Sequence, residues 1–459
     1  MKTTITTLLA TTTLLLAQGP LTPPGAPAPT MKTLDQIEPR TPLIAGSPGV
    51  SINGSGTITI SQSGSYYLTG NLSVTSGDGI FITASGVTLD LNGFTISSTS
   101  ATPAGTAIDI NASNISVSNG HILSGVTYDS GATGDQFSGS GISNGIDTNS
   151  TNYENIRLQN LSVQGVDFGG ILCSNLDSTL VEFCTVTVCG FTGIRAGLVK
   201  HCSVENAGAE GILAREVSFC YAISVGSDGI DASNNAAYST GVTSSTSTSS
   251  HGIRAGGNVI NSVGQSSGGD GIRCLGNVLN SNGFTNGSGG GIDALNVSHS
   301  TGVAASAASN GIEAGFNVTS SYGFSNISKG IFAGGTVSNS YGVTNGTSSS
   351  SDGIHSVSGP VTASTGQTSG SGKGIWAALS ISDSYGVSST GDGLYGTTVT
   401  NSFGQTNSAA SDGIFAFGTI ANCRASNPSG AALDARIISA STAVNGTINA
   451  SVAKVDGTP

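Results

Sequence analysis

Five aspartates each stand directly before a glycine in a recurring Gly-Ile step, where a carboxylate could shape a turn or hold a cation. They are Asp228, Asp270, Asp352, Asp392 and Asp412. An Asp side chain that accepts a backbone N–H bond caps the turn into the strand that follows. Asp392 and Asp412 lie one repeat apart, so these two carboxylates could also share a cation.

A second set of residues lies between two apolar or small positions just after the same glycines. In chain order its members are Arg195, Leu213, Asp231, Arg254, Arg273, Asp293, Glu313, Phe332, His355, Trp376, Tyr395 and Phe415. The stretch from Asp231 to Glu313 is charged and of mixed sign. Such a run is typical of a solvated ladder of cross-strand pairs.

The last five members of this set are aromatic, and they include the only tryptophan of the chain. At one ring per repeat they would form a flat strip roughly 20 Å long. Aromatic faces stack on sugar rings, and a regular exposed apolar patch indicates a contact surface. We therefore predict a carbohydrate-binding strip, with two alternatives: coverage by the long loops before each Gly-Ile step, or simple stacking of rings that favour strands. Its residues are Phe332, His355, Trp376, Tyr395 and Phe415. A second strip is predicted at Tyr322, Tyr341, Tyr385 and Phe403.

Cysteines and histidines predict no metal site, because no Cys-x-x-Cys pair occurs and no two histidines have the spacing of metal ligands. Cys184, Cys202 and Cys220 recur every 18 residues. This spacing predicts buried thiols stacked on one another, in a column that is mostly Ser elsewhere. A disulfide between neighbouring coils is the alternative. His201, beside Cys202, is expected at a corner.

The elements that must position these residues come from a repeat with a period near 20 residues. Its Gly-Ile step falls at Gly193, Gly211, Gly229, Gly252, Gly271, Gly291, Gly311, Gly330, Gly353, Gly374, Gly393 (followed by Leu394) and Gly413. A fixed period of this length is the mark of a stacked-repeat architecture. Within each copy the apolar residues alternate with a variable one, as in a strand with one buried face.

Each copy continues with an apolar position, then Asn in many copies, then usually Ser. Asn tolerates a left-handed backbone, so this column predicts sharp corners between strands, with amide stacked on amide. Helix formers are scarce, which excludes a helical repeat. We predict an all-β, single-stranded right-handed parallel β-helix of about 20 residues per coil, with roughly 18 coils.

Composition limits the partners. The chain has 69 glycines, 9% charged residues and a formal net charge of −12. This acidic balance, without a basic stripe, disfavours nucleic acid. The β-branched periodicity argues against disorder.

The chain is expected to divide into four parts. Residues 1–17 resemble a secretory signal peptide, and no later stretch has the apolar length to span a membrane. Residues 18–48 form a Pro-rich linker and N-terminal cap, in which 31–40 could be a short helix. Residues 49–432 form the β-helix, interrupted by a Gly/Ser/Asp loop at 123–150, and 433–459 form a C-terminal cap.

The run Leu89–Ile96, the opening Tyr66–Leu72 and the Gly-Ile coils resemble secreted bacterial right-handed β-helix proteins of the pectate-lyase-like superfamily. The lead from Met31 to Pro42 looks like that of uncharacterised planctomycete and verrucomicrobial members. In pectate lyases clustered acids hold Ca²⁺ and an Arg abstracts a proton, so the resemblance implies a possible Ca²⁺ site. His251-Gly252 resembles the His-Gly element of polygalacturonases, but their Asn-Thr-Asp and Asp-Asp elements do not occur.

We therefore expect a protein that is secreted, periplasmic or on the cell surface. Our favoured hypothesis is a non-catalytic β-helix that binds a glycan or a cell-envelope partner, with no cofactor. One alternative is a polysaccharide lyase or glycoside hydrolase with a non-standard site. The other is a structural rod or adhesin.

Overall fold

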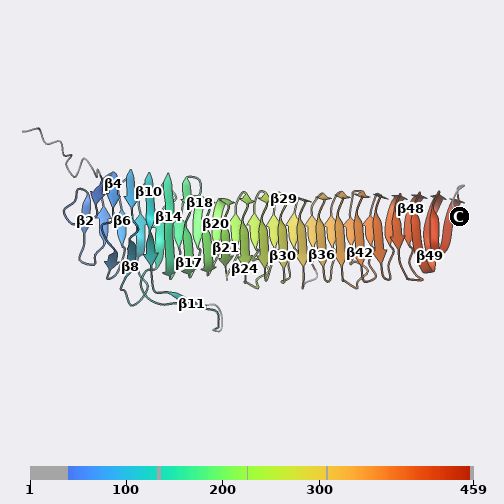
Figure 1. The fold of residues 1–459 in the computed structure, drawn as a ribbon, viewed down its shortest axis with the longest axis horizontal. Coiled ribbons are helices and arrows are strands. Elements are labelled where there is room, and N and C mark those ends of the chain that lie inside the picture. Colours follow the sequence, from blue (N-terminus) through green and yellow to red (C-terminus); the bar gives the residue numbers. More distant parts are fainter. Residues whose placement is uncertain (1–39, 132–135, 225, 307–308, 455–459) are drawn as a thin grey trace, which may run out of the picture. The chain divides into compact units, whose positions relative to one another are not determined.

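The computed structural model describes residues 40–131, 136–224, 226–306 and 309–454. Within this part the chain forms strands and no helix, with 53% strand in about 19 stacked turns of about 20 residues (Figure 1). The prediction of an all-β parallel β-helix is confirmed. Residues 1–40 and 41–459 are separate units. The predicted signal peptide, and residues 18–39 of the predicted linker and cap, lie outside the described residues.

The first sheet contains the Gly-Ile strands, and each strand pairs in parallel with its counterpart in the next coil. Its strands are β3 (Ile58–Ile60), β6 (Ile80–Ile82), β9 (Thr106–Ile110), β13 (Asn144–Thr148), β15 (Ile171–Cys173), β18 (Ile194–Lys200), β20 (Ile212–Ser218), β22 (Ile230–Ala232), β25 (Ile253–Ala255), β28 (Ile272–Cys274), β31 (Ile292–Ala294), β34 (Ile312–Ala314), β37 (Ile331–Ala333), β40 (Ile354–Ser356), β43 (Ile375–Ala377), β46 (Leu394–Thr400), β48 (Ile414–Ala421), β49 (Arg424–Ser439) and β50 (Thr442–Lys454). At its start β2 (Val50–Ile52) pairs antiparallel with β3.

The second sheet follows the first corner of each coil. Its further strands are β1 (Thr41–Pro42), β4 (Gly64–Tyr67), β7 (Val87–Asp90), β10 (Ile115–Leu123), β14 (Ile156–Val166), β16 (Thr179–Glu182), β23 (Ala236–Ala237), β26 (Val259–Ile260), β29 (Asn277–Leu279), β32 (Asn296–Ser298), β35 (Val318–Thr319), β38 (Val337–Ser338), β41 (Val361–Thr362) and β44 (Ser380–Ser382). The long strands β18, β20, β46, β48, β49 and β50 turn the corner and belong to both sheets.

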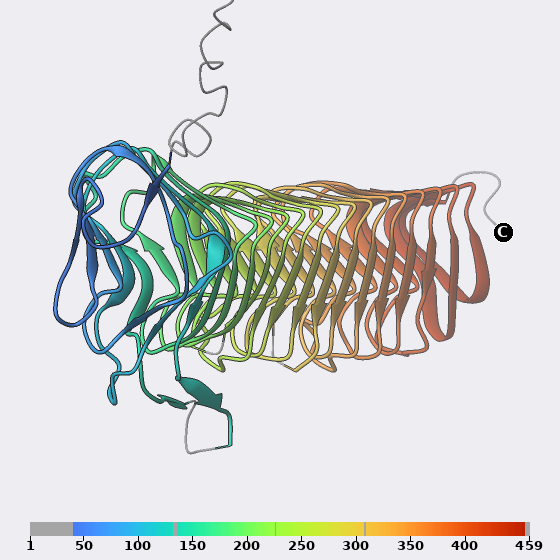
Figure 2. The same ribbon diagram turned by 60° about the vertical axis from the view of Figure 1, so that its left-hand side comes forward.

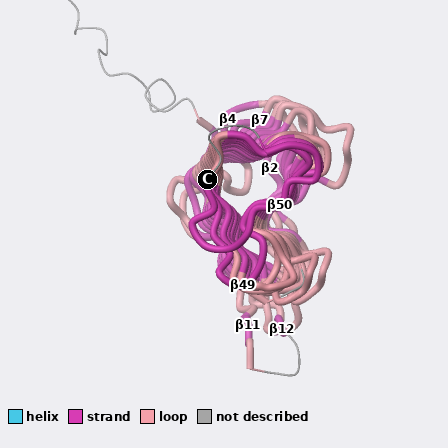
Figure 3. Tube along the Cα trace, turned by 90° about the vertical axis from the view of Figure 1, so that its right-hand side faces the viewer, coloured by secondary structure: helices cyan, strands magenta, loops and turns pink. Residues whose placement is uncertain are grey.

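The third sheet closes each coil, as the end-on view shows (Figure 3). Its further strands are β5 (Leu72–Val74), β8 (Thr95–Ser98), β17 (Thr185–Cys189), β19 (Ser203–Ala207), β21 (Tyr221–Ser224), β24 (Thr240–Thr243), β27 (Val263–Ser266), β30 (Asn282–Thr285), β33 (Thr301–Ala304), β36 (Tyr322–Ser325), β39 (Tyr341–Thr344), β42 (Thr365–Thr368), β45 (Tyr385–Ser388) and β47 (Phe403–Gln405). A separate antiparallel hairpin, β11 (Thr127–Asp129) and β12 (Gln136–Ser138), lies in the predicted loop 123–150.

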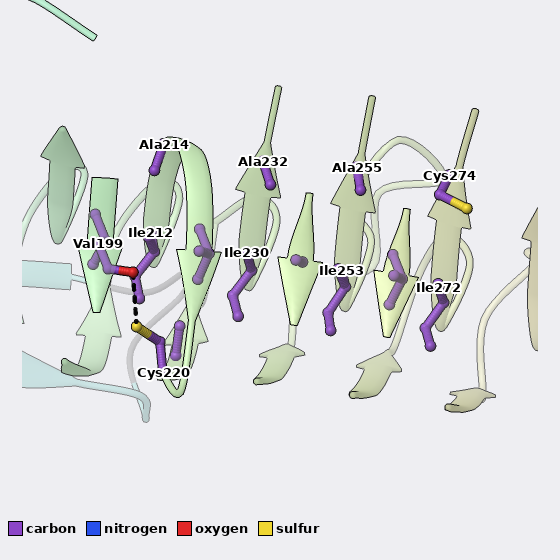
Figure 4. Packing of buried hydrophobic residues seen from close by; sticks show 14 of the residues in the cluster. Val199, Ile212, Ala214, Cys220, Ile230, Ala232, Ile253, Ala255, Ile272 and Cys274 are labelled. Atoms are coloured by element: carbon purple, nitrogen blue, oxygen red, sulfur yellow. Dashed lines mark hydrogen bonds between the residues drawn. The ribbon is translucent and has the colours of Figure 1, made fainter. Parts of the chain in front are cut away.

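The coils stack side by side along the solenoid (Figure 2), and the buried side chains form columns that run from coil to coil. All twelve apolar residues of the Gly-Ile steps are fully buried, and the register pairs Ile312 with Ile331 and Ile331 with Ile354. Ala214, Ala232 and Ala255 form the neighbouring column, which Cys274 continues (Figure 4). Because the period of about 20 residues equals one coil, residues one period apart become vertical neighbours.

Two glycine columns explain why the Gly-Ile step keeps its glycine. The central glycine of each third-sheet strand from β24 to β47, such as Gly323, lies against the backbone of a Gly-Ile glycine, here Gly330. A Cβ atom on Gly323 would lie within 3.0 Å of the Gly330 carbonyl oxygen. The two backbones can approach this closely only without side chains.

The predicted corners are confirmed. Asn261, Asn280 and Asn339 have φ of 50°, 49° and 49°, and the same column continues to Asn422 at 53°. The amide ladder that we expected there runs mainly along a neighbouring corner, the one before the second sheet. There each Asn amide donates to the Asn oxygen of the preceding coil at 2.9–3.3 Å; the residues are Asn235, Asn258, Asn277, Asn296 and Asn317.

The thiols occupy the predicted Ser column and are buried. Cys184, Cys202 and Cys220 each donate to the carbonyl two residues earlier, at 3.1–3.2 Å. The serines of the column, such as Ser321, donate in the same way at 2.8 Å. All seven cysteines are free thiols, so the structure forms the thiol stack and not the disulfide alternative. Burial raises the pKa of Cys173 to about 12.

Strand pairing does not stop where the C-terminal cap was expected to begin. Leu433 pairs with Ile414 in the Gly-Ile column, and β50 then pairs with β49. At the other end the pairing already begins with β1, before residue 49. Among the residues described, none forms a helix with the length and apolar character that crossing a bilayer would need.

Candidate functional site

The candidate site is the outward face of the first sheet from β22 to β48. The alternation that buries Ile and Ala turns the residue between them outward, so each coil contributes one side chain to a single column. The register places these side chains in the order predicted from the sequence, from Asp231 and Arg254 through Glu313 to Phe332 and Phe415. A charged half is thus continuous with an aromatic half.

A second column borders this face. It contains the residue before each Gly-Ile glycine, and in chain order its polar members are Asp228, His251, Asp270, Asn310, Lys329, Asp352, Lys373, Asp392 and Asp412. The aspartates were predicted to cap the turn into the strand that follows, but the bonds of four of them reach the next coil. Asp228, Asp270, Asp352 and Asp392 each accept the backbone N–H of the matching residue one coil on, at 2.6–2.8 Å. These bonds run between coils, so the aspartates connect successive turns.

The charged half contains a compact acid–base cluster. The Nε of Arg254 lies 3.0 Å from an oxygen of Asp228, and its Nη2 contacts Asp231. Burial raises the pKa of Asp228 to about 6, which outweighs the effect of the nearby Arg254. Burial likewise raises the pKa of Asp270 to about 6.

His251 is buried within this cluster and is neutral. Its Nδ1 accepts the backbone N–H of Asp270 at 3.0 Å, so the ring proton is assigned to Nε2. Burial, together with Arg273 and Arg254, lowers the pKa of His251 to about 4. Although Nδ1 lies 3.4 Å from an Asp270 carboxylate oxygen, the two groups form no ion pair, because the imidazole is neutral.

Two adjoining cavities lie over the charged half. The larger, of about 490 Å³, is lined by His251, Arg254 and Leu213 among others, and the next, of about 270 Å³, by Glu313 and Phe332. Arg273, Cys274 and Leu275 line both cavities, so together they form one groove. Arg273 is half-exposed, and its Nε lies 3.9 Å from Asp293, so its guanidinium remains accessible to a ligand.

The structure brings the five predicted aromatic residues together, but the orientation of their rings differs from that of the flat strip expected. His355 and Trp376 stack with ring centroids 4.2 Å apart and planes 12° apart. Tyr395 stacks on Trp376 at 6.5 Å and on Phe415 at 5.0 Å, both with planes 13° apart. The rings lie face to face along the coil axis, because adjacent coils are only about 4.8 Å apart and this spacing leaves room for stacked rings. Ring edges, and not faces, line the surface.

Charged side chains of the bordering column lie against these rings. Lys329 Nζ lies 5.6 Å from the Phe332 centroid, and Lys373 Nζ lies 5.6 Å from that of Tyr395. His355 Nδ1 lies 2.7 Å from a carboxylate oxygen of Asp352. The aromatic half therefore has a polar margin of ammonium and carboxylate groups.

The second predicted strip is split by a small residue. Tyr322 contacts Tyr341 at 5.5 Å, and Tyr385 stacks on Phe403 at 5.3 Å. Thr365 lies between the two pairs in the register. These rings belong to the third sheet, away from the groove.

A third aromatic stack was missed by the sequence analysis. Phe183, His201, Phe219 and Tyr238 stack on four successive coils with centroids 4.8–4.9 Å apart. All four have φ of 51–56° and occupy the corner column that is Asn elsewhere. Only His201 was placed at a corner from sequence. The signal was available, because Phe183, His201 and Phe219 each precede a cysteine of the thiol column.

Asp392 and Asp412, which from the sequence could share a cation, do not belong to a three-ligand site among the described residues. Among the described residues, no group of three or more His, Cys, Asp or Glu side chains is arranged to hold a metal ion. The Asp392 carboxylate instead accepts the Asp412 backbone N–H at 2.8 Å. Burial, with Asp392 and Asp434 nearby, raises the pKa of Asp412 to about 7.

Comparison with known proteins gives little further constraint. No protein-family model matches the chain, and no curated protein matches it. Among solved structures, the Azotobacter vinelandii mannuronan C-5 epimerase AlgE6 A-module is similar at 11% identity, over 86% of this chain and 89% of that chain, with a TM-score of 0.17. So distant a likeness supports no inference of a shared activity.

Proposed function

We propose that the chain is an exported, non-catalytic β-solenoid that binds an extended, carboxylate-bearing glycan of the cell envelope along the outward face of the first sheet. The observation that carries the proposal is the continuity of the face. Two cavities share Arg273, Cys274 and Leu275, and the column then continues into the aromatic half. A surface that extends along the coils fits a linear polymer better than a compact ligand.

The chemistry of the face favours a polyuronate over a neutral chain. The accessible guanidinium of Arg273 matches a carboxylate in charge and in hydrogen-bond geometry. The exposed side chains of Leu275 and Leu295 offer apolar surface beside it. Because ring faces are occupied by other rings, the aromatic half would contact sugars through ring edges and through Lys329 and Lys373. Export rests on the predicted signal peptide, and the pectate-lyase-like assignment belongs to the same proposal.

Calorimetric titration with oligouronates, neutral oligosaccharides and envelope glycans tests the proposal. We expect binding of oligouronates, weakened at least about tenfold by Arg273→Ala and measurably by Trp376→Ala. Thr319→Ala, on the outward face of the second sheet, is the control and should bind normally. Binding that is equally strong in all three variants would refute the assignment of the face. Absence of binding to every glycan would favour a structural rod.

A carbohydrate-active enzyme is the second candidate, and one observation favours it. His251, Asp228 and Asp270 combine a neutral imidazole with carboxyl groups whose pKa is near 6, and His251 lines the groove. Groups poised in this way are typical of general acid–base catalysis. Release of unsaturated or reducing ends from polyuronates, lost in His251→Gln, would establish a lyase or a hydrolase. Intact polymer after prolonged incubation would exclude both.

A further inference from the structure

The outward face of the third sheet is free of charge over ten successive strands, from β21 to β47. Each strand turns two side chains outward, and the first of each pair is Tyr221, Thr240, Val263, Asn282, Thr301, Tyr322, Tyr341, Thr365, Tyr385 or Phe403. The second is Ile223, Val242, Gln265, Phe284, Val303, Phe324, Val343, Gln367, Val387 or Gln405. None of the twenty is charged, although the chain carries a net charge of −12.

These side chains are accessible and apolar for the most part. Tyr221, Phe284, Tyr341 and Tyr385 are 36–40% exposed, and Phe324 is half-buried. In Figure 1 the strands β21, β24, β30, β36 and β42 stand in a row along the solenoid. A contiguous apolar patch of this regularity marks a contact surface in soluble proteins.

We propose that this face joins two copies of the chain into an antiparallel, two-fold symmetric dimer. The first argument is charge. The neutral face is bounded by exposed Glu205, on β19, at one end and by exposed Arg424, on β49, at the other. When the coil axes run in opposite directions, the Glu205 end of one copy meets the Arg424 end of the other, and both ends become complementary. A parallel arrangement would place like charges together.

The second argument is side-chain volume. The rings of the first column lie mainly in its C-terminal half, and the small or polar residues in its N-terminal half. An antiparallel arrangement centred between β33 and β36 sets Tyr322 over the partner's Thr301. It also sets Tyr341 over the partner's Asn282. Large side chains then face small ones over the centre of the interface, which is how two sheets interdigitate, and rings face each other only at its two ends, where Phe403 lies over the partner's Tyr221.

The third argument is area. Ten strands span about 40 Å along the coils and each strand about 13 Å, so two copies would bury about 1,000 Å². That lies at the lower end for a specific interface, which predicts a dimer that dissociates on dilution. Because two acidic chains repel one another, a neutral face is where they can meet. The groove on the first sheet is not part of this interface.

Sedimentation equilibrium of the full chain over a wide concentration range tests the dimer. We expect a reversible monomer–dimer equilibrium that Phe324→Lys abolishes, because it buries a charge at the centre of the interface. Thr319→Lys, the same charge on the second sheet, should leave the dimer intact. A monomer at all concentrations, or equal loss in both variants, would overturn the proposal.

A charge exchange tests the orientation of the two copies. Glu205→Arg and Arg424→Glu should each weaken the dimer about tenfold, since each sets like charges against each other, and the double variant should restore it. Circular dichroism of each variant checks that the solenoid is intact. A double variant no tighter than the single variants would rule out the antiparallel arrangement.

Discussion

At the residue scale, the positions with a left-handed backbone show which side chains suit the fold and which are strained in it. The left-handed corner column is mostly Asn, but a second left-handed position lies within β17 of the third sheet, where Val188 has φ of 58°. A β-branched residue is poorly suited to this conformation, whereas Asn adopts it readily. Asn206 takes the equivalent place in the next coil, at 56°.

We therefore expect Val188→Asn to stabilise the protein. Relief of the backbone strain should raise the free energy of unfolding by about 1 kcal/mol. Urea denaturation followed by circular dichroism measures the change. Val357→Asn, which exchanges the same side chains at an exposed position, is the control and should not stabilise. A lower denaturation midpoint for Val188→Asn would show that its apolar packing outweighs the strain.

Much of the site could be predicted at this scale, because one coil equals one sequence period. Once the Gly-Ile steps were aligned, the outward column from Asp231 to Phe415 followed directly. The orientation of the rings did not follow, because spacing fixes the height of a side chain and not its rotamer. The partners of His251 were also missed, since its column alternates between acidic, basic and amide residues and shows no single residue type.

The raised pKa of Asp412 predicts a pH dependence of stability. The folded pKa is about 7 and the ordinary value 3.8, so between these pH values the folded state binds more protons than the unfolded state. This stabilisation is complete below about pH 4 and is lost as the pH rises through 7. Asp412→Asn removes the dependence. We compare the free energy of unfolding of the variant with that of wild type at each pH. Because the carboxyl is partly solvated, we expect this difference to be about 1 kcal/mol more in favour of the variant at pH 8 than at pH 5.

Urea denaturation of both proteins at the two pH values measures that gain. If the free energies of unfolding of variant and wild type differ by the same amount at pH 5 and pH 8, Asp412 titrates normally in the folded state.

At the element scale, the close approach of the first and third sheets depends on glycine. The central glycines of the third-sheet strands face the Gly-Ile glycines backbone to backbone. The sequence period identified the Gly-Ile glycines, but it could not say why glycine recurs there. Only the cross-section of the coil shows that a side chain has no room there.

Substitution of one such glycine should be costly. In Gly323→Ala the new methyl group meets the Gly330 carbonyl oxygen, and the overpacking should lower the free energy of unfolding by about 2 kcal/mol or more. Gly70→Ala is the matched control, because its methyl group would meet no atom within 4 Å. Thermal melts of the two variants should differ clearly. Similar melting temperatures would indicate that the coils can shift apart without cost.

At the scale of the whole molecule, the solenoid repeats one type of outward residue over several successive coils. The first sheet combines a charged and an aromatic half, and the third sheet is neutral from β21 to β47. Repetition makes such faces long, so it favours extended ligands and self-association over compact sites. The fold was predictable from the periodic core, whereas the properties of each face depend on individual outward residues.

The central claim is that the outward face of the first sheet binds an extended glycan, and Trp376, the only tryptophan, lies within that face. Arg273 and Trp376 are five coils apart, or about 24 Å. The most direct measurement is tryptophan fluorescence during titration with oligouronates of increasing length. We predict a saturable change in Trp376 emission for oligomers that span this distance, lost in Arg273→Ala and retained in Thr319→Ala. Emission that stays constant while calorimetry detects no binding would contradict the claim.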